Sequence, residues 1–207
     1  MPKTQYIQQK EKSQPLFMKR GDILSEFFEI SDKAREGGMG DVFFCRDKRD
    51  NKFYVLKTFK ERDDKEKSQV LGDFRKEALL TFKMPRLPYV VFTRTLILDE
   101  TKMYLVMDFV GKQPHSFDEP VQSETLTHVL RNTKVEYKQA LVWGIEFCRG
   151  MQYLHKYGIS VHKDIKPDNI LIAPDNTIRI TDFGLSASNK KGGTKGYFPP
   201  EYNEKKL

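Results

Sequence analysis

The segment from Val161 to Gly184 concentrates side chains that can move a proton or bind a divalent cation. It reads VHKDIKPDNILIAPDNTIRITDFG and contains Asp164, Lys166, Asn169 and Asp182 around two Ile-rich runs. Carboxylate and amide oxygens are suitable ligands for a hard cation, and a lysine can stabilise a developing negative charge. A purely structural turn does not need this chemistry. The segment therefore predicts a site that holds a divalent cation and a phosphate group.

The two Ile-rich runs, at 169–173 and 177–181, predict a β-hairpin that turns at Pro174-Asp175-Asn176. A hairpin brings its two ends together, so Asn169 and Asp182 can converge on one cation. Asp164 is then free to accept a hydroxyl proton, while Lys166 stabilises a transferring phosphoryl group. The alternative is a chance turn followed by an unrelated Asp-Phe-Gly. The order and spacing of the two motifs argue against it.

A glycine-rich stretch, AREGGMGDV, places Gly37, Gly38 and Gly40 between two predicted strands. Glycines let backbone N–H groups approach phosphate oxygens without a Cβ in the way. Glycine-rich hairpins are common, so this motif alone is weak evidence. A dinucleotide-binding fold would run from strand into helix here, and a Walker loop would carry Gly-Lys-Ser/Thr. The sequence excludes both of these alternatives.

Lys57 lies in the middle of a predicted strand, YVLKTF. Taken in isolation, it is most simply an edge-strand lysine that faces water. A role in phosphate binding would require a carboxylate that holds its ammonium group in place. Glu77, in the one predicted helix of the first half of the chain, is the best candidate. A glutamate on a helix is ordinarily a surface residue, so this pairing depends on the rest of the site.

Hydrophobic periodicity predicts the elements that position these residues. The first half is β-rich with one helix, and the second half is mainly helical before its hairpin. The predicted strands of the first half are 27–34, 40–47, 52–60, 89–99 and 102–110, and the predicted helices of the chain are 63–84 and 137–157. We expect a basic N-terminal extension at 1–20, one lobe at 21–110 and a second lobe at 111–207.

The composition limits the other classes of function. The chain has 207 residues, is 38% hydrophobic and has a net charge of +7 from 36 Lys and Arg against 29 Asp and Glu. The lysines are scattered, without a basic-aromatic stripe, so we expect no nucleic-acid partner. Two distant cysteines indicate a reducing compartment, and no apolar run reaches ~18 residues. We therefore expect a soluble cytoplasmic protein with no membrane partner.

The glycine loop, Lys57, Glu77, HKDIKPDN, DFG and GTKGYFPPE follow one another in an order that resembles the eukaryotic-type protein kinase family over about residues 27–202. The resemblance implies an α+β, bilobal fold. Its N-lobe would be an antiparallel β-sheet with one helix, and its C-lobe would be partial and mainly helical. DIKPDN and Gly193-Thr194 are similar to the Ser/Thr branch. The implied reaction transfers a phosphoryl group from ATP, with Mg²⁺, to Ser or Thr of a protein.

The resemblance also implies roles for individual residues. Lys57 would hold the α- and β-phosphates and pair with Glu77, while Asp164 would be the catalytic base. Asn169 and Asp182 would hold Mg²⁺. The remaining residues implied in nucleotide binding are Met107 as gatekeeper, the Asp108 C=O and Val110 N–H on adenine, Val42, Val55 and Leu171 around the ring, and Gly37, Gly38 and Gly40 near the phosphates.

Departures from the family pattern add a second hypothesis. The chain stops shortly after Glu201, so a partial C-lobe is expected. The helix at 137–157 has one apolar face with Trp143 and Leu154 and begins another with Leu141, Ile145 and Cys148. An exposed second face would favour self-association or a protein partner. The alternative function is therefore a truncated, non-catalytic kinase fold that binds a nucleotide or a partner.

Overall fold

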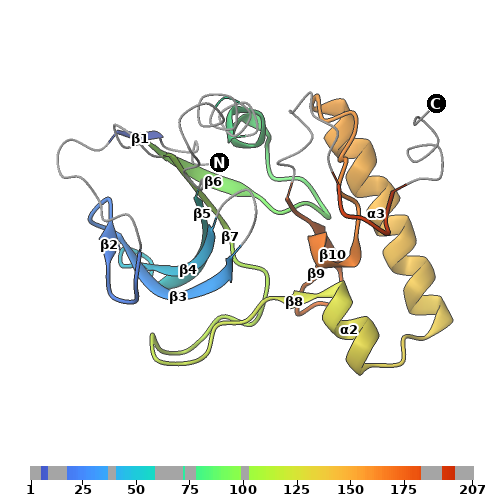
Figure 1. Ribbon diagram of the computed structural model, residues 1–207, viewed down its shortest axis with the longest axis horizontal. Helices are drawn as coiled ribbons and strands as arrows, with labels where there is room; N and C mark the ends of the chain where they lie inside the picture. Colours follow the sequence, from blue (N-terminus) through green and yellow to red (C-terminus); the bar gives the residue numbers. More distant parts are fainter. Residues whose placement is uncertain are drawn as a thin grey trace.

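The computed structural model describes residues 6–8, 18–36, 41–58, 72, 78–98, 103–182 and 193–198, without the side chains of 6–8 and 33–36. The chain forms two lobes that lie side by side (Figure 1). The first lobe is a sheet in the order β1-β6-β7-β5-β4-β3-β2. Its strands are β1 (Tyr6–Gln8), β2 (Ile23–Leu24), β3 (Phe28–Glu36), β4 (Asp41–Asp47), β5 (Lys52–Thr58), β6 (Thr93–Leu98) and β7 (Met103–Asp108).

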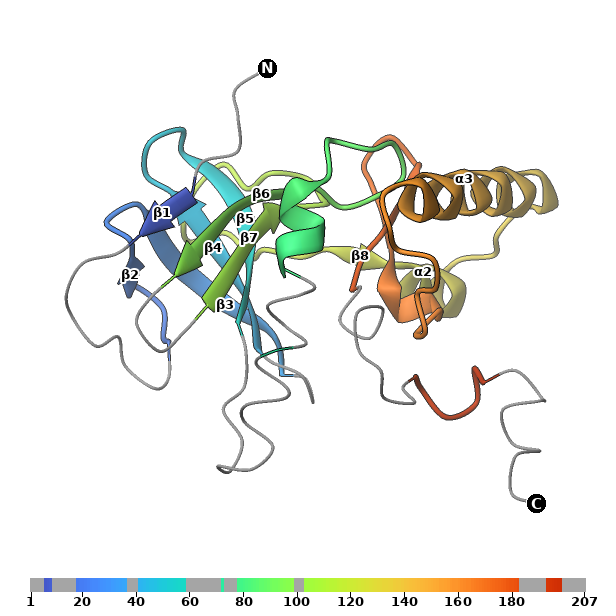
Figure 2. The ribbon, with the colours of Figure 1, turned by 90° about the horizontal axis from the view of Figure 1, so that it is seen from above.

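The large sheet is curled, as Figure 2 shows from above, and it buries side chains on both faces. Successive side chains of a strand point to opposite faces. Phe43 of β4 accordingly joins one apolar cluster with Leu56 and Tyr104, while its neighbour Phe44 joins another with Val55. Because both faces are covered, the inner strands β5 and β7 are nearly continuous apolar runs rather than alternating ones.

The second lobe contains a three-stranded sheet in the order β10-β9-β8. Its elements are β8 (Glu124–Thr125), α2 (Leu126–Asn132), α3 (Tyr137–Lys156), the 3₁₀ helix η1 (Pro167–Asn169), β9 (Ile170–Ile172) and β10 (Ile178–Ile180). The hairpin of β9 and β10 pairs Ile170 with Ile180. This arrangement confirms the predicted hairpin.

Helix α3 packs along the small sheet through a stripe that contains Trp143 and Leu154, as expected, but also Glu146 and Gly150. The indole Nε1 of Trp143 donates to the carbonyl of Asn176, 2.9 Å away, in the β9–β10 turn. The buried carboxylate of Glu146 accepts a hydrogen bond from the Ile178 N–H at 3.0 Å. Two polar anchors thus fix the hairpin to the helix.

The predicted second apolar face of α3 is exposed. Leu141 is 48% exposed and Ile145 is 53% exposed, and Val142 beside them is 46% exposed. Cys148 is also exposed. Ala140 and Gly144 are exposed as well. The contact with the hairpin selects the side of the helix that carries Glu146 and Gly150 beside Trp143 and Leu154.

The two lobes are joined next to β10. The loop after helical residues 78–83 forms a parallel bridge between Val90 and Ile180. The N–H of Val91 donates to the Ile180 carbonyl (2.9 Å), and the Ile180 N–H donates to the Tyr89 carbonyl (2.8 Å). These bonds connect the loop that precedes β6 to the strand that leads to Asp182.

A long loop, residues 111–122, leaves the end of β7 and returns to β8 along the large sheet. Its two ends meet closely, since a Cβ on Gly111 would lie 2.7 Å from the Gln122 carbonyl oxygen. Farther out, the Phe117 ring lies between the guanidinium groups of Arg20 and Arg46, each 4.7 Å from its centroid. The loop therefore packs against the first lobe before the chain enters the second.

The α+β, bilobal architecture confirms the predicted fold class, with its strands near the expected bounds. Three strands (β1, β2 and β8), helix α2 and the 3₁₀ helix η1 were missed. β1 lies in the predicted extension and pairs in parallel with β6, whereas β2, β8 and α2 lie outside the predicted strands and helices. Of the helix predicted at 63–84, only residue 72 and residues 78–83 are described as helical. Within the described part of the chain, no helix is long and apolar enough to cross a membrane.

Candidate active site

Lys57 projects from β5, which lies between β4 and β7. It is therefore on an inner strand, and the interpretation as an edge-strand lysine facing water was wrong. The residue is 7% exposed, and its Nζ lies 3.0 Å from Oδ1 of Asp182. This ion pair joins the large sheet to the residue that follows the β9–β10 hairpin. A buried ammonium group needs such a partner.

Asp164 is surrounded by donors. Its Oδ2 lies 2.8 Å from Nζ of Lys166 and accepts a hydrogen bond from Nδ2 of Asn169 at 3.0 Å. Its Oδ1 accepts one from the hydroxyl of Thr194 at 2.8 Å. Burial alone would raise the pKa of Asp164, but the hydrogen bonds from Lys166, Thr194 and Asn169 outweigh it and hold the pKa below 3.8. Asp164 is therefore ionised at neutral pH.

Thr194 was not among the predicted site residues. Its hydroxyl accepts from Nζ of Lys166 at 2.6 Å while it donates to Asp164. The sequence marks it only through the Gly193-Thr194 pair that resembles the Ser/Thr branch, which does not place its hydroxyl at Asp164. Its place in the network depends on the fold of residues 193–198, which no local pattern predicts.

The backbone brings Asn169 and Asp182 to the same end of the hairpin. The Thr181 N–H donates to the Asn169 carbonyl at 3.0 Å, directly before Asp182, which has a positive φ of 66°. The ring of His162, 1% exposed, contacts the Thr181 carbonyl through Nε2 at 3.0 Å. Burial lowers the pKa of His162, so this ring packs as a neutral support for the segment.

The donor set fits a hard divalent cation such as Mg²⁺. Asn169 uses its Nδ2 on Asp164, and its Oδ1 is buried without a hydrogen-bond partner among the described residues. A buried unpaired acceptor is costly, and a cation would satisfy it. Asn169 Oδ1 and the Asp182 carboxylate are both hard oxygen ligands. The described residues contain no group of three or more His, Cys, Asp or Glu that could hold a metal ion. Further ligands would therefore come from phosphate oxygens or water.

Three of the predicted adenine-binding side chains lie on neighbouring strands of the large sheet. Val55 of β5 pairs with Met107 of β7, and both belong to an apolar cluster with Val42. Leu171 is partly buried on β9. Asp108 ends β7, and Val110 follows it with 7% exposure.

Two aromatic residues of this cluster were not predicted. The Phe44 and Phe109 rings meet edge to face, with centroids 5.6 Å apart. A cavity of about 720 Å³ lies beside Phe44 and reaches Gly111 and the β9–β10 turn at Pro174. Lys57 and Asp164 do not line this cavity. It adjoins the residues that follow β7 rather than the charged residues of the site.

Four predicted residues lie outside the described part of the chain: Gly37, Gly38, Gly40 and Glu77. Their roles therefore stay predictions. The other predicted residues fall into two groups. Lys57, Asp164, Lys166, Asn169 and Asp182 lie around the Asp164 loop and the hairpin end. Val42, Val55, Met107, Asp108 and Val110 belong to the large sheet or follow β7, with Leu171 on β9 of the small sheet.

The Lys57–Asp182 ion pair thus joins the curled β-sheet to the end of the β9–β10 hairpin. The model of the protein kinase domain matches residues 28–206. The chain therefore belongs to the protein kinase domain family.

Curated relatives carry kinase names. A probable serine/threonine-protein kinase of Clostridium perfringens is 28% identical over 87% of this chain and 26% of its own length. CBL-interacting serine/threonine-protein kinase 20 of Arabidopsis thaliana is 28% identical over 91% of this chain and 42% of its own length. An Aurora kinase of Schizosaccharomyces pombe is 29% identical over 86% of this chain and 48% of its own length. The chain thus spans less than half the length of these relatives.

Proposed function

We propose that this chain is an ATP- and Mg²⁺-dependent protein kinase that transfers the γ-phosphoryl group to Ser or Thr hydroxyls of proteins. The observation that carries the proposal is the ion pair of Lys57 and Asp182 beside the Asp164–Asn169 loop. The ion pair supplies a cation, Lys57, and one oxygen ligand, Asp182. The loop supplies a candidate base, Asp164, and a second oxygen ligand, Asn169. A fold kept only for binding has no need of all four.

Asp164 accepts the proton of the substrate hydroxyl while the hydroxyl oxygen attacks the γ-phosphorus. The bond between the γ-phosphorus and the β–γ bridging oxygen breaks, and ADP leaves with that electron pair. Lys166, held 2.8 Å from Asp164, stabilises the negative charge on the transferring group. The low pKa of Asp164 keeps it ionised before the reaction.

Mg²⁺ would be held by Asn169 and Asp182 and would neutralise charge on the phosphate oxygens. Lys57 would orient the α- and β-phosphates from the sheet side, assisted by Glu77, and Gly37, Gly38 and Gly40 would approach them through backbone N–H groups. The remaining predicted contacts concern the adenine ring. Asp108 C=O and Val110 N–H would hold its edge, and its faces would contact Val42, Val55, Met107 and Leu171.

The test is incubation of the chain with γ-labelled ATP, Mg²⁺ and a mixed protein substrate. We expect label on Ser and Thr, and a loss of at least about a hundredfold in rate with Asp164→Asn, the size typical of a lost general base. Equal incorporation by the wild type and the variant would show that Asp164 is not the base. Nucleotide binding without any transfer by the wild-type chain would support the non-catalytic alternative.

The protein is also proposed to associate through the exposed face of α3, formed by Leu141, Val142 and Ile145. Contiguous exposed apolar side chains favour contacts with another protein surface. In size-exclusion chromatography with light scattering, we expect a dimer or larger species that Leu141→Asp with Ile145→Asp converts to a monomer. A monomeric wild type at micromolar concentration would contradict this.

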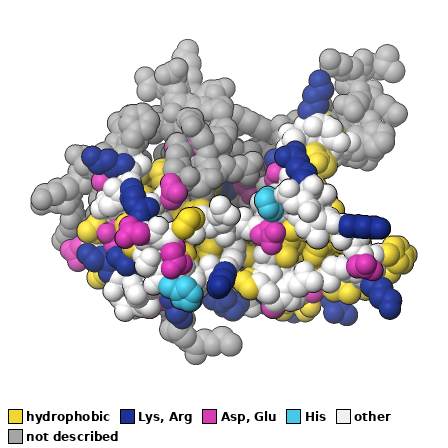
Figure 3. Space-filling view, turned by 90° about the horizontal axis from the view of Figure 1, so that it is seen from below, with side chains coloured by type: hydrophobic (Ala, Val, Ile, Leu, Met, Phe, Trp, Pro, Cys, Tyr) yellow, Lys and Arg dark blue, Asp and Glu magenta, His cyan; other side chains and the backbone are white. Residues whose placement is uncertain are grey.

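Three broader predictions belong to the same proposal. Residues 21–110 and 111–207 would act as the two lobes around the nucleotide, after an extension at 1–20. Two free cysteines favour a cytoplasmic location. A nucleic-acid partner is not proposed, because basic and acidic side chains are interspersed on the face in Figure 3 rather than gathered into one basic patch.

A further inference from the structure

Two arginine side chains hold Asp108, the residue at which the chain leaves β7 and the segment 108–113 begins. Asp108 ends β7 opposite Tyr54 of β5, and only 18% of its side chain is exposed. One carboxylate oxygen accepts a hydrogen bond from Nε of Arg94 at 2.6 Å, and the other lies 2.5 Å from Nη1 of Arg86. Arg94 comes from β6 and Arg86 from the loop before it, so two separate parts of the chain meet on one side chain.

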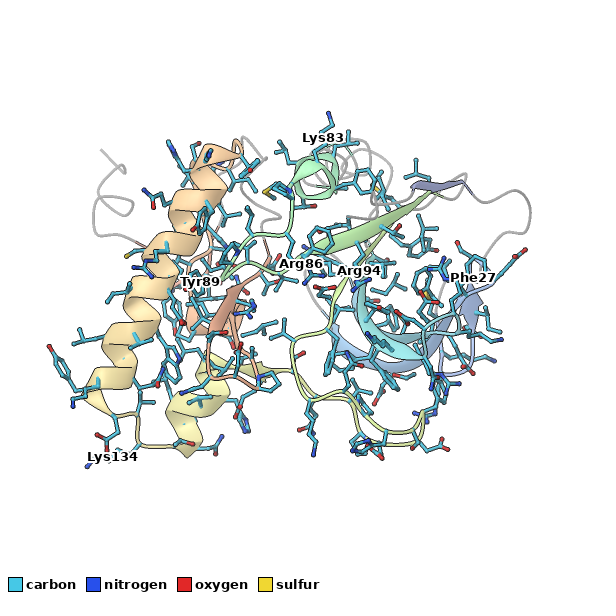
Figure 4. The ribbon with its side chains drawn as sticks, turned by 180° about the vertical axis from the view of Figure 1, so that it is seen from behind. Phe27, Lys83, Arg86, Tyr89, Arg94 and Lys134 are labelled. Carbon is cyan, nitrogen blue, oxygen red and sulfur yellow. The ribbon has the colours of Figure 1, made fainter. Side chains whose placement is uncertain are left out.

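Each arginine is itself fixed by an aromatic ring. The guanidinium of Arg94 lies 4.7 Å from the Tyr54 centroid, and that of Arg86 lies 4.7 Å from the Phe92 centroid. A planar guanidinium can stack on a ring and donate hydrogen bonds at the same time, which a lysine cannot do equally well. Figure 4 shows Arg86 and Arg94 beside each other on the back of the molecule.

The backbone of Asp108 is held as well, since its N–H donates to the carbonyl of Phe92 at 2.9 Å. Burial disfavours a charged Arg94, yet the hydrogen bond and charge of Asp108 more than offset this and raise the pKa of Arg94. The contact with Asp108 therefore stabilises the charged form of Arg94.

The other end of the segment is held by a glutamine. The pairing of β5 with β7 ends at Tyr54 and Asp108. At the next residue of β5, Phe53, the side chain of Gln113 takes over: its Oε1 accepts from the Phe53 N–H at 2.8 Å, and its Nε2 donates to the Phe53 carbonyl at 3.2 Å. A side-chain amide thus continues the hydrogen-bond pattern of a strand across the gap.

We propose that Arg86, Arg94 and Gln113 are positioning residues that fasten the 108–113 segment to the large sheet and thereby set the affinity for the nucleotide. They act through the backbone of the segment and do not touch the nucleotide themselves. The inference rests on the proposed function, in which Asp108 C=O and Val110 N–H contact adenine. Groups that are ordered before binding lose less conformational entropy when the ligand arrives, so a loosened segment binds more weakly.

The experiment measures the dissociation constant of Mg²⁺-ATP for the full chain by calorimetry. We expect Arg94→Ala and Gln113→Ala each to weaken binding about fivefold, and the double variant about twentyfold, because the two contacts lie at opposite ends of the segment. Arg94→Lys keeps the charge but not the stacked fork, and we expect about twofold. Hydrogen exchange of the amides at 108–113 should accelerate in the Ala variants.

Arg49→Ala is the matched control. Arg49 also pairs with an aspartate, Asp47 at 2.7 Å, and also lies over an aromatic ring, Phe27 at 4.4 Å, but it lies in the β4–β5 turn and these partners are not part of the 108–113 segment. It should leave both nucleotide affinity and exchange at 108–113 unchanged. An unchanged or tighter dissociation constant for Arg94→Ala and Gln113→Ala would overturn the inference while the proposed function stands. A wild-type chain that binds no Mg²⁺-ATP would overturn both.

Discussion

Gly150 of α3 and Ile180 of β10 are in such close contact that a Cβ at position 150 would lie 2.7 Å from Cδ1 of Ile180. The same added atom would lie 3.2 Å from the Tyr89 carbonyl oxygen, in the loop that bridges the two lobes. Three elements thus meet at a helix position without a side chain. One of them, β10, ends at Ile180, two residues before Asp182. This contact makes α3 the support for the charged site.

Gly150→Ala should therefore destabilise the protein by about 1–3 kcal/mol, the usual effect of overpacking, although alanine is the better helix former. Gly144→Ala is the control on the same helix, because nothing lies within 4 Å of its added Cβ. It should stabilise the fold by about 0.5–1 kcal/mol. Urea unfolding of both variants checks this, and changes of equal sign would contradict the contact.

Replacing Lys57 should reduce nucleotide affinity. Lys57→Met keeps much of the side-chain volume but removes the charge that holds Asp182 at 3.0 Å, and we expect Mg²⁺-ATP to bind about tenfold more weakly. Lys52→Met, at the exposed start of the same strand, is the control and should bind normally. Equal affinities of the Lys57 and Lys52 variants would argue against a phosphate contact at Lys57.

The stabilising effect of Asp164 should depend on pH in the acid range. Its pKa in the folded protein lies below the ordinary 3.8, so the folded state binds a proton less readily than the unfolded chain. The stabilisation is complete above about pH 4 and is lost as the pH falls through the folded pKa. The difference in unfolding free energy between the wild type and Asp164→Asn should therefore shrink from pH 6 towards pH 3. A difference that grows on acidification would reverse the assigned sign.

The buried carboxylate of Glu146 should be needed for stability through one hydrogen bond. Glu146→Leu removes the acceptor for the Ile178 N–H and leaves a buried donor unpaired, which costs about 1–3 kcal/mol. Glu146→Gln keeps an acceptor oxygen and should cost less than about 1 kcal/mol. Thermal unfolding of the two variants measures the difference. A leucine variant as stable as the glutamine variant would show that this bond contributes little.

Much of the site could be predicted because its residues are close in sequence or flank a simple element. Asp164, Lys166 and Asn169 share one loop, and a two-strand hairpin necessarily returns Asp182 to Asn169. The strands around Val55 and Met107 could also be predicted, since a run of apolar residues is enough to predict a buried strand.

Other features depend on contacts between distant segments and left no local signal. The sequence alone predicts that Lys57, in the middle of a strand, is exposed. Its burial follows only from the pairing of β5 with β4 and β7 on either side. Thr194 reaches Asp164 only through the course of the chain after the hairpin. The face of α3 that is buried includes Glu146, which a hydrophobic pattern assigns to solvent, because its partner is a backbone N–H on another element.

The amino-acid sequence by itself determined the kinase family through its short motifs, and the antiparallel sheet and the hairpin through apolar periodicity, because both kinds of pattern involve residues that are close in the chain. Only the tertiary structure decided that Lys57 meets Asp182, that Thr194 joins Asp164, and that Arg86, Arg94 and Gln113 hold the chain after β7. Those contacts depend on how separate elements pack, and packing is a property of the whole fold.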